Sequence, residues 1–164
     1  MNEDMMSWVN DIFNIGFSDG IYNELREYAG SEYLYGDFYD NLRASENAED
    51  YLINLSINIA KKHAEELAPA ISRNLQANDV PLDAIIIAIA SELLRLFEHD
   101  INKHKAYNYA EEFSKIEKNI EIYETEKRAW DKGYDKYMEN NIKFMSSYVD
   151  RIANVYCNTE TIKR

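Results

Sequence analysis

The chain has few of the residues that end helices or cross-link a fold. Its 164 residues include only 2 prolines and 5 glycines. A fold of many short strands needs tight turns rich in these two residues, so their scarcity argues against a β-sandwich or barrel. The single cysteine, Cys157, excludes an intramolecular disulfide framework and is expected to be a half-buried packing thiol. We therefore expect a reducing, cytoplasmic location.

Long apolar runs and basic segments are also missing. The most apolar run, residues 84–90, is followed at once by Ser91 and Glu92, whereas a membrane-spanning helix needs roughly 20 apolar residues. The acidic first residues, MNEDMM, lack the basic start and apolar stretch of a secretory signal. A net charge of −12 repels both nucleic-acid backbones and anionic membranes. We expect no membrane binding and no direct binding of nucleic acid.

What the chain does contain favours helices, because Glu, Lys, Ile, Leu and Ala are abundant. We predict an all-α protein, an irregular helical bundle. Its central helix, at about residues 82–103, is apolar almost all round and follows a break that ends in Pro81.

Capping residues and glycines predict two short helices near the amino terminus. Ser7 can cap a first helix that ends near Gly16. Ser18 or Asp19 can begin a second helix that ends at Gly30.

Residues 31–45 are expected to be irregular or to form a short helix around residues 38–42, and a longer helix follows. The longer helix opens at Ser45 or Asn47, and Pro69 should kink it or split it near Ala68. His63 lies on the apolar face of this helix and is expected to be half-buried with a hydrogen-bond partner.

The last third of the chain has an unbroken heptad pattern, which predicts a long C-terminal helix or a helical hairpin at about residues 106–157. Gly133 is the expected bend of a hairpin. The seam is rich in tyrosine, which favours packing within the chain, although a homodimer remains open. Eleven of the fourteen seam positions are apolar or aromatic, and the other three are Lys127, Asn141 and Arg151. The fourteen positions are Ala106, Tyr109, Phe113, Ile116, Ile120, Tyr123, Lys127, Trp130, Tyr134, Tyr137, Asn141, Phe144, Tyr148 and Arg151.

Negative charge is concentrated at the amino terminus. Residues 1–50 contain twelve acidic and two basic side chains, a balance of −10 out of the total of −12. This segment is also rich in aromatic residues, unlike most acidic disordered segments. We therefore predict a single helical domain, residues 1–164, in which an acidic, aromatic-rich subregion (1–46) docks on a helical body (47–164).

Two metal-dependent classes of protein are also all-helical. The segment 96–104 (LFEHDINKH), together with 55–60 (LSINIA), resembles the metal-dependent HD phosphohydrolases, an all-helical family. The resemblance implies His99 and Asp100 as metal ligands, with a downstream aspartate such as Asp131 or Asp135. The chain departs from that family's pattern, because Leu55 stands where the family has a histidine ligand.

The second alternative, a di-iron carboxylate bundle, needs the Glu-x-x-His motif on two helices, and this motif does not occur in the chain. Our principal interpretation is therefore a non-enzymatic protein without a cofactor or metal.

The charge distribution predicts a protein-interaction module that binds, and inhibits, a basic nucleic-acid-binding partner. The class includes phage-type anti-CRISPR or anti-restriction DNA mimics, immunity proteins and antitoxins. Alternatives are a homo-oligomeric assembly protein and a degenerate HD-type phosphohydrolase. Carboxylates on a helical surface can imitate a row of phosphates, and tyrosines are enriched in binding hot spots. The predicted partner-binding residues are Asp19, Glu24, Glu27, Glu32, Tyr33, Tyr35, Asp37, Tyr39 and Asp40.

Overall fold

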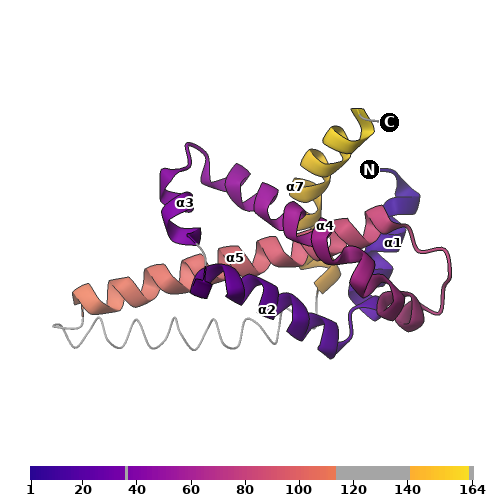
Figure 1. The fold of residues 1–164 in the computed structure, drawn as a ribbon, viewed down its shortest axis with the longest axis horizontal. Helices are drawn as coiled ribbons and strands as arrows, with labels where there is room; N and C mark the ends of the chain where they lie inside the picture. The colour runs from indigo at the N-terminus through magenta and orange to yellow at the C-terminus, as the bar shows by residue number, and fades with distance from the viewer. Residues whose placement is uncertain (36, 114–140, 163–164) are drawn as a thin grey trace.

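A computed structural model describes residues 1–35, 37–113 and 141–162, and its regular structure in these ranges is entirely helical (Figure 1). The all-α prediction is therefore confirmed. None of the helices in the described ranges is both long and apolar enough to cross a bilayer.

The chain begins with α1 (Glu3–Asp11), which continues into a short π-helix, η1 (Ile12–Gly16). The predicted cap at Ser7 is wrong, because Asn2 caps α1 instead. Its side chain accepts a hydrogen bond of 2.8 Å from the backbone N–H of Met5, and asparagine is among the best helix caps. The predicted end near Gly16 is confirmed.

The second helix, α2 (Asp19–Tyr35), begins where the sequence predicts. The Ser18 hydroxyl accepts a hydrogen bond of 3.4 Å from the N–H of Ile21. The predicted end at Gly30 is wrong by five residues. Glycine ends a helix by adopting a positive φ, and no described glycine does so. Burial of Leu25 and Ala29 on the preceding turns offsets the cost of about 1 kcal/mol for a glycine inside a helix.

Two further helices, α3 (Phe38–Ala44) and α4 (Ala48–Leu75), follow. Of the two predicted caps for α4, Asn47 is used: its side chain accepts a bond of 3.1 Å from the N–H of Asp50. The predicted split near Ala68 is wrong, since α4 continues through Pro69. The buried Leu67 and Ile71 on either side of Pro69 hold both halves against the core.

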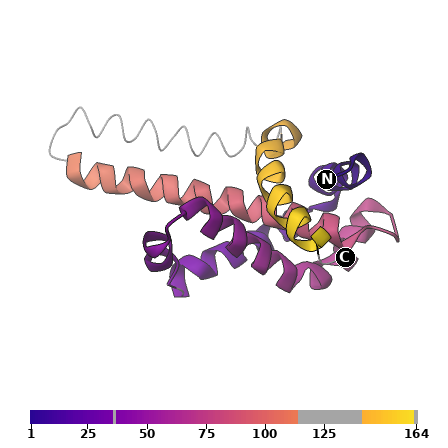
Figure 2. The same ribbon diagram turned by 90° about the horizontal axis from the view of Figure 1, so that it is seen from above.

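The central helix, α5 (Leu82–Phe113), starts directly after Pro81 as predicted but runs ten residues beyond the predicted end at 103. Its residues 84–97 are all buried. Residues 104–113 contain neither glycine nor proline, so nothing in the chain stops the helix there. The carboxyl-terminal end of α5 projects beyond the other described helices (Figures 1 and 2).

The last helix, α7 (Asn141–Ile162), packs on α5 and α4. An ion pair joins Arg151 to Glu98. The predicted single helix over residues 106–157 would place Arg151 roughly 70 Å from its start, at 1.5 Å per residue, whereas Glu98 lies only eight residues before that start. The prediction of a single long C-terminal helix is therefore wrong. The turn of the alternative hairpin, and the bend at Gly133, lie outside the described residues.

The predicted heptad seam is also wrong by one residue in α7. The buried side chains are Met145, Val149, Ile152, Ala153 and Tyr156, whereas the seam residues Tyr148 and Arg151 are only half-buried. Arg151 stays at the edge of the core because its guanidinium pairs with carboxylates on α4 and α5.

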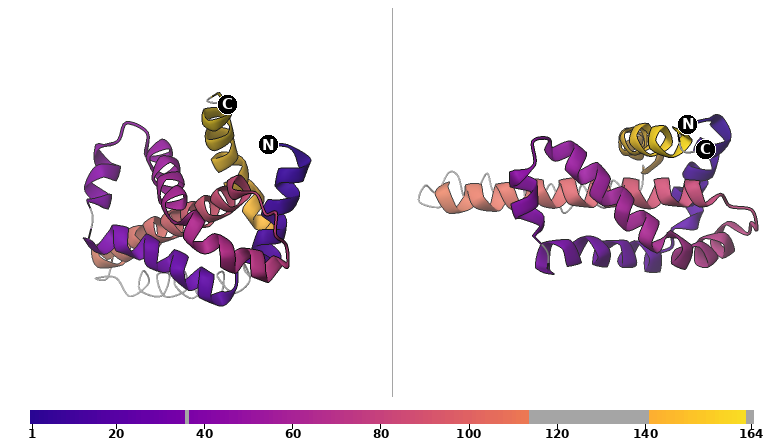
Figure 3. Two further views of the ribbon diagram at one scale, coloured as in Figure 1. Left: turned by 45° about the vertical axis from the view of Figure 1, so that its right-hand side comes forward. Right: turned by 45° about the horizontal axis from the view of Figure 1, so that its top comes forward.

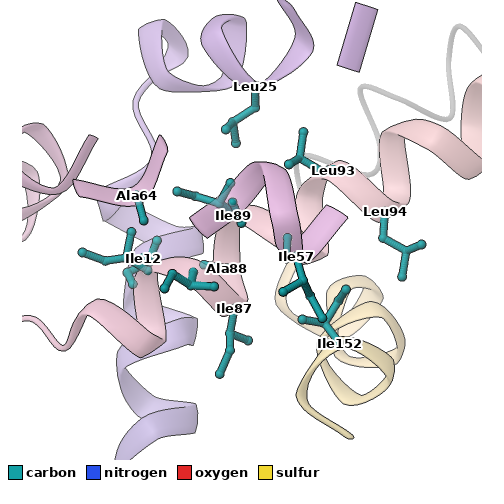
Figure 4. Packing of buried hydrophobic residues seen from close by; sticks show 14 of the residues in the cluster. Ile12, Leu25, Ile57, Ala64, Ile87, Ala88, Ile89, Leu93, Leu94 and Ile152 are labelled. Carbon is teal, nitrogen blue, oxygen red and sulfur yellow. The ribbon is translucent and has the colours of Figure 1, made fainter. Parts of the chain in front are cut away.

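One hydrophobic cluster joins the helices, with α5 at its centre (Figure 4). Ile12 of η1, Leu25 of α2, Ile57 of α4 and Ile152 of α7 all belong to it. Figures 1 and 2 show α2 and α7 on opposite sides of α5. The further views in Figure 3 show α3 and the start of α4 lying away from α1.

Candidate functional site

The predicted partner-binding residues are centred on α2, whose two faces differ sharply. Its inner face buries Ile21, Tyr22, Leu25 and Ala29, each at most 5% exposed. Since these residues repeat at helical spacing, the other face is left to solvent. Three predicted site residues, Asp19, Glu24 and Glu27, are exposed on α2. Glu32 is half-buried, and the side chains of Tyr33 and Tyr35 lie outside the described part of the chain.

Tyr28 lies among the carboxylates of α2. Its ring stacks on that of His63 from α4, with centroids 3.9 Å apart and an interplanar angle of 9°. Partial burial, followed by the charges of Glu24 and Glu66, raises the pKa of Tyr28 to about 12. Burial makes the largest contribution to this rise in pKa, and the carboxylates of two helices add to it.

Glu66 extends the acidic surface from α2 onto α4. This exposed residue lies outside the first fifty, so the charge count along the sequence missed it. Its carboxylate is 3.5 Å from the Nδ1 atom of His63, and the prediction of a half-buried, hydrogen-bonded His63 is confirmed. We call Asp19, Glu24, Glu27 and Glu66 the α2–α4 acidic face.

The predicted site residues on and beside α3 are arranged differently. Asp37 is exposed, whereas Asp40 forms an exposed ion pair of 2.6 Å with Arg43 that partly neutralises it. Tyr39 is half-buried and packs edge-on against Phe38, with ring centroids 5.0 Å apart. Burial, and then the charge of Asp100, raises its pKa. The structure thus leaves α2 as the main carrier of unburied carboxylates in this region.

His99 and Asp100, the residues implied by the resemblance to HD phosphohydrolases, are adjacent on α5 and half-buried. No group of three His, Cys, Asp or Glu side chains within the described residues is arranged to hold a metal ion. The side chain of His104, and Asp131 and Asp135, fall outside that part of the chain. Within it, Asp100 acts as a charge beside Tyr39.

A buried ion pair on α5 was not predicted from the sequence. Glu92 is 2% exposed and Arg95 is 4% exposed. The Nε atom of Arg95 donates to both carboxylate oxygens of Glu92, at 3.2 and 3.1 Å. Burial raises the pKa of Glu92, and the Arg95 charge acts in the opposite direction. The one available sequence signal was the pair's i,i+3 spacing within an otherwise apolar helix.

A second polar group joins α7 to the body. The Nε atom of Arg151 lies 2.9 Å from an oxygen of Glu49 on α4, and its guanidinium also contacts Glu98 on α5. The Tyr156 hydroxyl donates a hydrogen bond of 2.6 Å to Asp83 at the start of α5. The helix α7 itself lies on the side of α5 opposite to α2 (Figure 2).

Comparison with protein-family models, with curated proteins and with solved structures finds no match for this chain. Its function is therefore inferred from its residues and their geometry.

Proposed function

We propose that this protein is an acidic interaction module that binds a basic, nucleic-acid-binding protein and inhibits it by occupying its nucleic-acid-binding surface. DNA-mimic inhibitors of nucleases, immunity proteins and antitoxins are the classes that fit this description. The observation that carries the proposal is the α2–α4 acidic face, in which exposed carboxylates stand on helices whose opposite sides are buried in the core.

The carboxylates stand on a rigid helix, and this favours binding. A disordered acidic tail would lose conformational entropy on binding. Here the inner face of α2 is anchored by side chains such as Leu25, at 0% exposure. The stack of Tyr28 on His63 further joins α2 to α4. The carboxylates are thus presented on a preorganised surface, as the phosphates of a duplex are.

Negative potential on such a face also favours rapid encounter with a basic groove. The amino-terminal fifty residues supply most of the net charge, and Glu66 adds to it from α4. A partner that normally binds phosphates has the complementary surface. Binding of this kind weakens steeply as salt concentration rises.

The test starts with affinity capture of proteins from the native host lysate on the immobilised full chain. The captured protein is then purified, and its affinity is measured at two salt concentrations. We expect a basic nucleic-acid-binding protein whose binding to duplex DNA is displaced by this chain. The triple variant Glu24→Gln, Glu27→Gln, Glu66→Gln should bind at least about tenfold more weakly, with a shallower salt dependence, a loss of about 1.4 kcal/mol.

A matched control removes the same number of charges elsewhere. Asp11, Asp79 and Asp150 are all exposed and lie outside the α2–α4 acidic face. Changing these three to asparagine should leave the affinity close to that of the native chain. Equal weakening by both triple variants would show that only net charge matters, and an unchanged affinity in the first would rule out this face as the binding surface.

A further inference from the structure

The imidazole of His63 joins the two helices of the α2–α4 acidic face. Its ring stacks on that of Tyr28 from α2, with centroids 3.9 Å apart and an interplanar angle of 9°. Its Nδ1 atom lies 3.5 Å from the carboxylate of Glu66. The side chain of His63 is 21% exposed, whereas that of Glu66 is 72% exposed. A half-buried titratable group therefore contacts a carboxylate that is open to a partner.

The charges that act on the Tyr28–His63 stack are carboxylates. Burial, and then the charges of three glutamates, raise the pKa of Tyr28. These are Glu24 and Glu27 on α2 and Glu66 on α4. Of the positions one helical turn from His63 on its own helix, only position 66 carries a charge. A positive charge on the imidazole would therefore act directly on the potential of these three carboxylates.

The cations nearest to His63 in the sequence point away from the stack. Lys61 lies about 200° around α4 from His63, over the ring of Tyr156 on α7, and the exposed Lys62 lies about 100° around. η1 contains no charged residue. The ion pairs of the other elements packed on α4 have their own partners: Asp40–Arg43 on α3, Glu92–Arg95 on α5, and Arg151 of α7 with Glu49 and Glu98. Among the described residues, His63 thus faces carboxylates.

Protonation of His63 would change the charge of the face without changing its shape. Histidine is the side chain whose charge ordinarily changes between pH 5 and 8. A neutral imidazole leaves the carboxylates at full strength, whereas an imidazolium pairs with Glu66 and adds one positive charge to the surface. The stack itself is kept, because a cation over the face of the Tyr28 ring is stabilised by that ring. The attraction for a basic partner is electrostatic, so it should fall.

We propose that His63 makes the α2–α4 acidic face pH-sensitive: the face binds a basic partner most tightly when the imidazole is neutral, and protonation of the imidazole weakens that binding. The inference rests on the proposed function, because it concerns the regulation of the same surface. The coupling is reciprocal, so a bound partner whose cations lie near the imidazole opposes its protonation. A single charge among exposed carboxylates should change the affinity by about threefold.

The experiment measures the affinity of the full chain for an acetylated octa-arginine peptide at pH 8.0 and pH 5.5, at low ionic strength. Arginine stays charged over this range, so any change in affinity arises in the chain. The native chain should bind about threefold more weakly at the lower pH. His63→Phe, which keeps a ring beside Tyr28, and His63→Gln, which keeps a polar group beside Glu66, should both lose this change. His99→Gln on α5 is the matched control and should keep it.

The triple variant Glu24→Gln, Glu27→Gln, Glu66→Gln separates this inference from the proposed function. It should bind the peptide more weakly than the native chain at both pH values. Equal binding would overturn the face as a cation-binding surface, and both proposals with it. If the triple variant binds more weakly but either His63 variant keeps the native change with pH, the proposed function stands and the role of His63 is overturned.

Discussion

Charged side chains have different surroundings on the two sides of α5. On one side, α2 turns its apolar residues inward and leaves Asp19, Glu24 and Glu27 in solvent. On the other, α7 docks through Arg151, whose charge is paired with carboxylates of α4 and α5. Exposed charges contribute little to folding but are available for recognition. Charges that are buried or shared between helices decide which arrangement of those helices is allowed.

The largest effect is expected at the buried pair on α5. Arg95→Met removes the partner of Glu92 and leaves a carboxylate in the core. At neutral pH this should lower the free energy of unfolding by about 4 kcal/mol, as when one member of a buried ion pair is removed. Urea denaturation at pH 7.5 measures the loss.

The stability of Arg95→Met should also depend on pH, in a direction set by the pKa of Glu92. Burial already raises the pKa of Glu92, and Arg95 opposes that rise, so the pKa of Glu92 should rise further in Arg95→Met. Between that raised pKa and the ordinary value of about 4.3, the folded state binds more protons than the unfolded state. The variant should therefore regain stability as the pH falls through that interval. A deficit that stays constant down to pH 5.5 would contradict this account.

The matched control replaces both members of the pair. Glu92→Leu combined with Arg95→Met leaves no buried charge and roughly preserves volume. Its stability at pH 7.5 should equal or exceed that of the native chain. A double variant as unstable as Arg95→Met would show that the hydrogen bonds of the pair, and not its charges, hold α5 in place.

The next effect tests whether α2 is anchored as firmly as α7. Leu25→Ala empties a fully buried position on the inner face of α2. The expected loss of stability is about 3 kcal/mol, from lost burial and the cavity that remains. Ile152→Ala on α7, also 0% exposed, is the comparison. A much smaller loss at Leu25 would mean that the acidic face stands on a weakly attached helix.

Sequence patterns predicted much of the fold because single-helix features are local. The apolar run of α5 and the caps at Ser18 and Asn47 depend only on neighbouring residues. The predicted helix ends were wrong where contacts between residues distant in the chain outweigh local preferences. Gly30 and Pro69 sit inside helices because the turns around them are buried against other helices.

The candidate site was predictable to a similar degree. The exposed carboxylates of α2 follow from its helical periodicity, so Glu24 and Glu27 could be named in advance. Glu66 could not, since it joins them only because α4 lies beside α2, where His63 stacks on Tyr28. The phase error in α7 has the same origin, because Arg151 finds its partners 102 and 53 residues away in the chain.

The smallest effect on stability is expected where the effect on binding is largest. The triple variant Glu24→Gln, Glu27→Gln, Glu66→Gln should change the free energy of unfolding by no more than about 0.5 kcal/mol, because exposed side chains away from the core contribute little. It should also lower the pKa of Tyr28 from about 12 toward 10, since glutamate charges add to the effect of burial there. Ultraviolet titration of the variant, with Tyr28→Phe in the same background subtracted, measures that pKa. If the triple variant unfolded as readily as Arg95→Met, the carboxylates of α2 would be structural, and the contrast between the two sides of α5 would disappear.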